Sequence, residues 1–204
     1  KLRSKKIQIL KNNQEIINKS NWIFLAVTPD VGLKILKSYK YKKNQTIVSF
    51  ISTINLKELK KIIKVKSNIV RAIPLPPISL NKGPIPIYPP NARVKSFFKQ
   101  LGTVIEINNE KLSLNFWATS GIMASFYELL NSMSSWLVKK GVKRENAQKY
   151  ITSLFSALSE DAVKHSNQDL KYLVRDSQTP EGLNEQGIRE LKKGNFYKST
   201  HKTL

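Results

Sequence analysis

Residues 176–186, which read Asp-Ser-Gln-Thr-Pro-Glu-Gly-Leu-Asn-Glu-Gln, form a polar stretch whose residue types suit the binding of an anion. We expect Thr179 to cap a helix that starts at Pro180 and runs to Lys193, which leaves the first amide N–H groups without intrahelical acceptors. Gly182 has no side chain to block close approach. Helix starts of this kind bind carboxylates and phosphates. The alternative is an ordinary capped surface helix, which the same pattern describes.

Few other residues suggest chemistry. His165 lies four residues from both Asp161 and Asp169, a spacing that suits a metal site. With Ser166 beside it, His165 could also belong to a catalytic triad. On a helix, however, this spacing more often produces surface ion pairs, and we expect those here. The sequence has no cysteine, which excludes a thiolate metal site and a cysteine nucleophile. We therefore predict no metal site.

Apolar runs alternate with helical patterns in the first half of the chain. Strands are predicted at 22–27, 46–51, 68–73 and 104–107, with a proline-containing edge strand at 85–88. Helices are predicted at 14–20, 31–38, 55–64 and 92–101. The first run contains no polar residue, as expected of a strand buried on both faces of a parallel sheet. This order predicts an α/β fold with a doubly wound, Rossmann-like, mostly parallel sheet.

Ligands of such sheets bind beyond the carboxyl ends of the strands. The residues that follow the predicted strands are 28–29, 52–53 and 74–77, although each group could also simply end a strand. The glycine-rich turn that would hold the pyrophosphate of a dinucleotide is absent from the sequence. Either the fold is not a nucleotide-binding one, or its first βαβ portion precedes Lys1. The chain starts without Met, which favours the second explanation and an N-terminally truncated domain.

The second half of the chain is predicted to be all helical, which divides the chain into domains 1–108 and 109–204. Apolar residues at 126–137 form one helical stripe, ended by Gly141, and those at 150–162 form another. Their area exceeds what two helices can cover by themselves. We therefore expect a homodimer through these helices, or a larger assembly. Burial against the chain's own sheet domain is the alternative.

The formal net charge of +21 suggests a polyanionic partner. Only six of the 35 basic residues are arginines, however, and the lysines are scattered among Ile and Asn instead of forming a stripe with aromatic residues. We therefore predict no nucleic-acid partner, although the positive field would attract an anionic dinucleotide. No apolar run reaches the length of a membrane span and no signal peptide is visible. A soluble cytoplasmic protein with no membrane partner is expected, and the lack of cysteine agrees with a reducing compartment.

Four stretches, in order along the chain, resemble pyrroline-5-carboxylate reductases, and the likeness covers essentially the whole chain. Residues 12–15, Asn-Asn-Gln-Glu, followed by 21–29, Asn-Trp-Ile-Phe-Leu-Ala-Val-Thr-Pro, are similar to the family's asparagine-containing turn and its leucine-alanine-valine-lysine-proline strand end. Residues 70–77, Val-Arg-Ala-Ile-Pro-Leu-Pro-Pro, are similar to its strand ending in methionine-proline-asparagine-threonine-proline. Ser120-Gly121 resembles the serine-glycine-serine-glycine-proline turn, and 179–184 the serine-proline-glycine-glycine-threonine-threonine loop.

The resemblance implies a dinucleotide-binding domain followed by a helical domain that interlocks into a dimer. It also implies hydride transfer from NADPH or NADH to the C=N carbon of 1-pyrroline-5-carboxylate, which yields proline. In the cofactor site it implies a contact of Asn13 with the adenosine side. Ala26, Val27 and Thr28 would line the ribose and nicotinamide, with Ser52 nearby.

For the substrate, the resemblance implies that its carboxylate is held by Thr179, Gly182, Leu183 and Asn184. The candidate catalytic side chains are Thr179, near which a proton source is expected, and Asn184, which replaces a threonine that donates to the substrate. Hydride transfer needs little more than alignment of the two reactants, so a catalytic His or Cys is not required.

The chain departs from the family at Leu75, which replaces an asparagine, and at Glu181, which replaces a glycine beside the expected carboxylate site. A negative charge there would repel an anionic substrate unless it points outward. Two alternatives therefore stay open: a reductase of a different keto or imino acid, and a catalytically altered relative that acts as a dimeric anionic-metabolite-binding protein.

Overall fold

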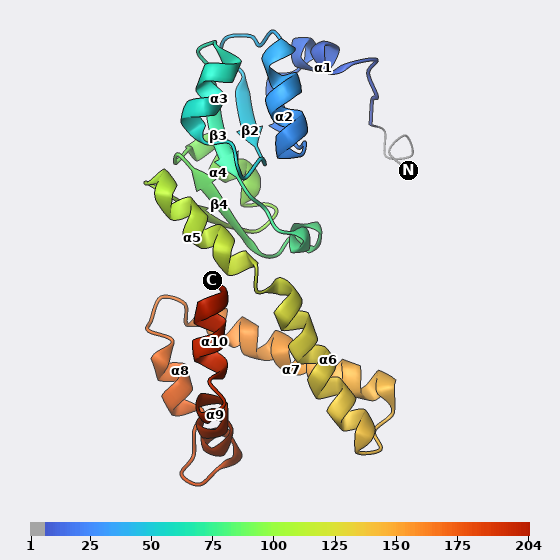
Figure 1. Ribbon diagram of the computed structural model, residues 1–204, viewed down its shortest axis with the longest axis vertical. Helices are drawn as coiled ribbons and strands as arrows, with labels where there is room; N and C mark the ends of the chain where they lie inside the picture. The colour runs from blue at the N-terminus through green and yellow to red at the C-terminus, as the bar shows by residue number, and fades with distance from the viewer. Residues whose placement is uncertain (1–6) are drawn as a thin grey trace. The chain divides into compact units, whose positions relative to one another are not determined.

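The computed structural model describes residues 7–204, which divide into two compact units. The first unit ends at Trp117, and the second comprises Ala118–Leu204. Figure 1 shows the sheet-containing unit in blue to green and the helical unit in yellow to red. The chain start at Lys1, to which the predicted truncation refers, lies outside the described residues.

The strands of the first unit form a mostly parallel sheet, as predicted. Within residues 7–204, five strands pair in the order β1-β2-β3-β4-β5. β1, β2 and β3 are mutually parallel, β4 is antiparallel to β3, and β5 is parallel to β4. Their bounds are Trp22–Leu25 for β1, Thr46–Ser49 for β2, Asn68–Ala72 for β3, Pro84–Tyr88 for β4 and Thr103–Glu106 for β5.

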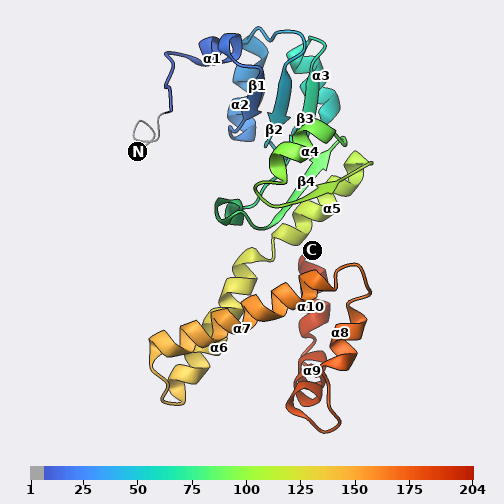
Figure 2. The same ribbon diagram turned by 180° about the vertical axis from the view of Figure 1, so that it is seen from behind.

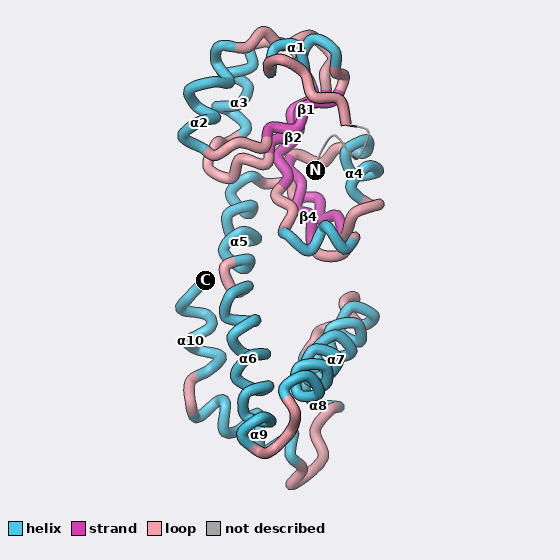
Figure 3. Tube along the Cα trace, turned by 90° about the vertical axis from the view of Figure 1, so that its right-hand side faces the viewer, coloured by secondary structure: helices cyan, strands magenta, loops and turns pink. Residues whose placement is uncertain are grey.

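Helices cover both faces of this sheet, as a doubly wound fold requires (Figure 3). One face carries α1 (Asn13–Lys19), α2 (Pro29–Ile35) with the 3-10 segment η2 (Leu36–Ser38), and α3 (Leu56–Ile63); the other carries α4 (Ala92–Phe98). A further 3-10 segment, η3 (Pro76–Leu80), follows β3. Successive strand residues point to opposite faces. Ile47 therefore packs in one core with Leu59 of α3, and Val48 packs in the other with Phe98 of α4.

The start of α3 is fixed by local sequence. The Asn55 side chain accepts a hydrogen bond from the Glu58 amide (2.9 Å), and the Glu58 carboxylate accepts one from the Asn55 amide (3.0 Å). This capping box satisfies two amides that the helix leaves without partners. The helix predicted at 55–64 is confirmed, and its cap at Asn55 sets the position of the turn between β2 and α3.

The predicted edge strand at 85–88 was placed wrongly, because β4 lies inside the sheet between β3 and β5. The carbonyls of Gly83 and Ile87 accept hydrogen bonds from Thr103 and Ile107, so the odd-numbered residues face β5. The nitrogens of Pro84 and Pro86 therefore point toward β3. Since the β3–β4 ladder pairs only Arg71 with Tyr88 and Ala72 with Ile87, the missing N–H groups cost little.

β1 is not buried on both faces, contrary to the sequence prediction. Ile23 and Leu25 are buried, whereas Phe24, on the opposite face, is 39% exposed. Phe24 lies in a partly exposed aromatic cluster with Trp22, Phe50 and Phe97, with ring centroids 5.5–6.0 Å from its own. Figure 2 shows β1 at the border of the sheet, with β2 as its neighbour.

The second unit is helical, as predicted. α5 (Glu110–Ser120) leads into it, followed by α6 (Met123–Lys139), α7 (Arg144–Lys164), α8 (Lys171–Asp176), α9 (Leu183–Lys193) and α10 (Phe196–Thr203). α6 and α7 pack against each other, as do α9 and α10. Among residues 7–204, every helix is too short or too polar to cross a lipid bilayer.

Candidate functional site

The carboxyl ends of three parallel strands lie together. In the sheet register Leu25 of β1 is beside Ser49 of β2, and Ser49 is beside Arg71 of β3. The amide of Phe50 also donates to the carbonyl of Leu25 (3.0 Å). The turns that follow these strands, which contain the predicted cofactor residues 26–28 and 52, therefore leave one edge of the sheet.

Three of the predicted cofactor residues line a common pocket. Asn13, Ala26 and Val27 border a pocket of about 250 Å³ formed by α1, the end of β1, and the segment from α2 to Tyr41. The Asn13 side-chain amide donates to the Tyr39 hydroxyl (2.9 Å), which orients it. Thr28 is not among the residues that line this pocket; it precedes α2, and its carbonyl accepts from the Gly32 amide (2.8 Å).

One of the residues that line this pocket is a buried tyrosine. Tyr41 is buried, and its hydroxyl lies 3.4 Å from the carbonyl of Leu36. Desolvation, with a smaller contribution from Tyr39, raises the pKa of Tyr41 to about 12. The phenol is therefore neutral and offers the pocket no negative charge at neutral pH.

Ser52, the remaining predicted cofactor residue, borders a second and larger pocket of about 450 Å³ in the same unit. The turn from β2 to α3 and the helix α5 form its walls. Its lining residues are Ser52, Thr53, Asn55, Lys57, Arg71, Glu110, Lys111, Leu114 and Trp117. The cations outnumber the single carboxylate, so the pocket favours an anionic ligand.

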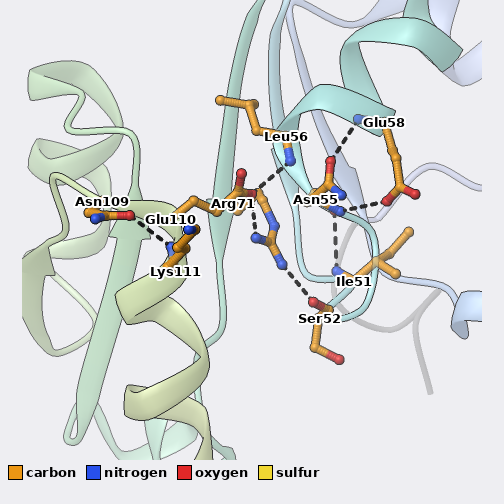
Figure 4. A network of polar contacts seen from close by, with 10 residues as sticks. Ile51, Ser52, Asn55, Leu56, Glu58, Arg71, Asn109, Glu110 and Lys111 are labelled. Carbon is orange, nitrogen blue, oxygen red and sulfur yellow. Dashed lines mark hydrogen bonds and ion pairs between the residues drawn. The ribbon is translucent and has the colours of Figure 1, made fainter.

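Arg71 and Glu110 form an ion pair at this pocket, which sequence reasoning missed (Figure 4). Arg71 is only 4% exposed, although it carries a charge. Its guanidinium donates to the Glu110 carboxylate (2.5 Å) and to the carbonyl of Ser52 (2.6 Å). An arginine within the apolar strand sequence Asn-Ile-Val-Arg-Ala was the available signal, because a buried charge needs a partner.

The loop at 179–184 belongs to the second unit, and its helix starts later than predicted. α9 begins at Leu183 with Gly182 as its N-cap, so Thr179 is not the cap and Pro180 is not the first helical residue. The Gly182 amide donates to the Thr179 carbonyl (2.9 Å), and Glu181 has φ +61°. Proline in the second position and a positive φ in the third are typical of a type II turn. This turn takes up the residues that the helix prediction included.

Of the predicted substrate residues around the start of α9, Thr179, Leu183 and Asn184 are exposed and Gly182 is half-buried. Leu183 is 86% exposed, and the amides of Leu183, Asn184 and Glu185 have no acceptor among residues 7–204. The Asn184 side chain donates to the carbonyl of Ser177 (2.8 Å), which leaves its oxygen and one N–H for other partners. The Glu185 carboxylate folds back and accepts from the Glu181 amide (2.6 Å). The backbone amides that could bind an anion are therefore those of residues 183–185.

His165 takes part in a local surface interaction and not in a triad. Its Nδ1 lies 2.9 Å from the carbonyl and 3.5 Å from the carboxylate of Asp161. Asp169 instead interacts with Lys171, 3.8 Å away. The predicted surface pairing is confirmed for Asp161. In the part of the chain that the structure describes, no group of three or more His, Asp or Glu residues could hold a metal ion.

Comparison with known proteins gives a family match for the C-terminal part of the chain. Residues 110–204 match the sequence profile of the family described as pyrroline-5-carboxylate reductase dimerisation. No curated protein sequence matches the chain significantly.

Solved structures extend the likeness to nearly the whole chain, each with a TM-score of 0.80. The 1-pyrroline-5-carboxylate reductase of Streptococcus pyogenes is 20% identical and matches over 98% of this chain and 81% of its own. The pyrroline carboxylate reductase of Plasmodium falciparum, solved with NADP bound, is 24% identical over 95% of this chain and 77% of its own. That of Coxiella burnetii is 21% identical over 95% and 76%. At these identities, the likeness establishes the fold.

Proposed function

We propose that this chain, whose residues 110–204 belong to the dimerisation-domain family of pyrroline-5-carboxylate reductases and whose fold is that of these enzymes, reduces a cyclic imino acid with NADPH or NADH. The substrate that we favour is 1-pyrroline-5-carboxylate, which would yield L-proline. The observation that carries the proposal is the common sheet edge at which the turns containing 26–28 and Ser52 emerge, on a fold shared with reductases.

The residues at this edge fit part of a dinucleotide. The pocket at the end of β1 offers the Asn13 amide and the Tyr39 hydroxyl among apolar walls, which suits an adenosine or ribose group. Ala26, Val27 and Thr28 would line the ribose and nicotinamide, and Ser52 would lie nearby. A glycine-rich turn for the pyrophosphate does not occur among the described residues. The fit therefore concerns the nucleoside and nicotinamide ends.

The loop of α9 would hold the substrate. Its free amides at 183–185 and the positive end of the helix dipole favour a carboxylate. Thr179 and Asn184 would donate to the substrate or supply a proton through a hydroxyl or a water. Glu181 and Glu185 oppose this with negative charge, although Glu185 is engaged with a backbone amide and Glu181 is exposed.

The protein's part in the reaction is alignment. A bound nicotinamide supplies a hydride, which adds to the carbon of a protonated C=N bond and gives an amine. The strand-end turns would fix the position of the nicotinamide, and the amides of α9 would fix the carboxylate of the imine. Such alignment can account for about 7–11 kcal/mol of a barrier, so no further acid or nucleophile is required.

The assay is NADPH consumption by the complete gene product with cyclic imino acids of five- and six-membered rings. We expect turnover with at least one of these, faster with the five-membered ring, and little with open-chain keto acids. NADPH that is not consumed with any imino acid, in a folded preparation, would refute the proposal.

We also propose a homodimer through the helical unit. Trp136 is 59% exposed and borders a groove of about 550 Å³ between α6 and α7, with Met133, Leu137, Ile151 and Leu154. Phe126, Leu129 and Phe196 line a second apolar groove between α6 and α10. Exposed apolar area of this extent marks an interaction surface. The family of the dimerisation domain indicates a second copy of the chain as the partner.

A second candidate function is binding without catalysis. Two features favour it: Glu181 places a negative charge two residues before the free amides in the sequence, and the Asn184 side-chain amide is already engaged with the Ser177 carbonyl. Both weaken the expected binding of an imino acid. This alternative predicts saturable binding of a carboxylate-containing metabolite with no NADPH consumption, which the same assay combined with calorimetry would detect.

A further inference from the structure

The buried Arg71 links three segments at the carboxyl end of the parallel strands: its own strand β3, the turn between β2 and α3, and the start of α5. Arg71 is the fourth residue of β3, and its strand neighbours Val70 and Ala72 are buried. Burying a charge costs several kcal/mol unless it is well paired, and an aliphatic residue would fill such a place at lower cost. Packing alone therefore does not explain an arginine here.

The contacts of Arg71 converge on the turn between β2 and α3. One guanidinium nitrogen donates to the carbonyl of Ser52 (2.6 Å), and another donates to the Glu110 carboxylate (2.5 Å). The same carboxylate oxygen accepts from the amide of Leu56, the first residue of α3 (2.7 Å). Figure 4 shows that the pair thereby holds both ends of the turn, at Ser52 and at Leu56.

Aromatic packing keeps the pair in place. The Trp117 ring of α5 lies over the guanidinium, 4.6 Å from its carbon to the ring centroid. The Arg71 Nε is buried without a hydrogen-bond acceptor in the described part of the chain. The orientation of the Arg71 side chain is thus set by its hydrogen bonds to Glu110 and Ser52 and by the Trp117 ring. A displaced guanidinium would lose both hydrogen bonds.

We propose that Arg71 and Glu110 are positioning residues, which hold the turn at Ser52 in the orientation that the nicotinamide end of the cofactor requires. This inference rests on the proposed reductase function. Neither residue needs to touch the cofactor or the substrate. Their effect would pass through the Ser52 carbonyl and the Leu56 amide, whose directions they set.

The test compares Glu110→Gln with Glu106→Gln in the complete gene product. Both changes remove one negative charge from the first unit. Glu106 pairs with Lys95 of α4, and its side chain is 30% exposed, close to the 25% of Glu110. Glutamine keeps an oxygen for the Leu56 amide, so Glu110→Gln weakens the ion pair with little change in size. Glu106 is not among the residues of either pocket described above.

We expect Glu110→Gln to lower kcat/KM about tenfold, through kcat or the KM for NADPH, while Glu106→Gln stays within about twofold of the wild type. The thermal midpoint of each variant, measured in parallel, separates this effect from lost stability. In addition, Arg71→Lys should retain more activity than Arg71→Met, because lysine keeps the charge but cannot form both contacts of the fork.

A folded Glu110→Gln variant with wild-type kcat, KM and cofactor affinity would overturn the inference, even if its thermal midpoint is lower. An inactive wild type would instead count against the proposed function. In that case, the dissociation constant for NADPH, measured by fluorescence, still decides the inference: weaker binding in Glu110→Gln than in Glu106→Gln supports it, and equal binding refutes it.

Discussion

Replacing Gly182 with alanine tests whether the Thr179 hydroxyl donates a hydrogen bond to the substrate. A Cβ atom on Gly182 would lie 2.2 Å from Oγ1 of Thr179 and 2.9 Å from its carbonyl oxygen. Both distances are shorter than van der Waals contact allows, so the Thr179 side chain must rotate and the turn must open slightly. The backbone of Gly182 itself, at φ −75° and ψ 163°, is accessible to alanine. The substitution therefore displaces Thr179 without straining residue 182.

The expected change in stability is small. Alanine gains about 0.4–1 kcal/mol through the unfolded chain, whereas it is a poorer N-cap than glycine by a similar amount. Weakening the hydrogen bond from the 182 amide to the Thr179 carbonyl costs about 1 kcal/mol. We therefore expect a net loss of about 1 kcal/mol in the free energy of unfolding. Loss of a hydrogen bond to a charged substrate costs about 1.5–3 kcal/mol, which lowers kcat/KM roughly 10- to 150-fold.

The assay is steady-state imine reduction together with urea unfolding. Gly187→Ala is the matched control, since Gly187 is exposed within α9 and a Cβ there meets nothing within 4 Å. It should add up to about 1 kcal/mol of stability and leave turnover unchanged. Thr179→Val should match Gly182→Ala in activity, and the double variant should lose little more than either. A Gly182→Ala enzyme with wild-type kcat/KM would refute the assigned role of the Thr179 hydroxyl.

Three further changes test other parts of the structure. Glu181→Gly should stabilise the protein by about 0.5–1 kcal/mol, because the left-handed conformation at φ +61° is costly for glutamate. The same change removes a negative charge and should lower the KM for an anionic substrate. A lower urea midpoint than that of the wild type would contradict the expected gain in stability. Burial raises the pKa of Tyr41 from 10.0 to about 12, so the contribution of Tyr41 to the free energy of unfolding is complete below pH 10 and should be lost as the pH rises from 10 to 12. The Tyr41→Phe variant should lack this part of the loss in thermal unfolding. A variant with the same pH profile as the wild type would contradict the prediction. Trp136→Asp should convert the proposed dimer into a monomer in light-scattering chromatography, since it places a charge in the apolar groove of α6 and α7. A dimer of this variant that persists at low micromolar concentration would exclude the groove from the interface.

Much of the first unit could be predicted from local patterns. The helix at 55–64 and the apolar runs of β2 and β3 could be predicted because helix starts and periodicity depend on neighbours within one helical turn or strand. The start of α9 could not be predicted from local patterns. Thr179 followed by Pro180 reads as a cap, but the conformation of Glu181 turns the chain and moves the helix start to Leu183.

By itself, the sequence determined the α/β unit followed by a helical unit, because strand and helix patterns depend on residues close together in the chain. Tertiary structure alone decided that β4 lies inside the sheet, that Ser52 borders a different pocket from Asn13 and Ala26, and that Arg71 meets Glu110. The last pair is separated by 39 residues along the chain. Such contacts arise only when strands and helices pack, since the partner of a buried charge is chosen by proximity in space and leaves no periodic mark in the sequence.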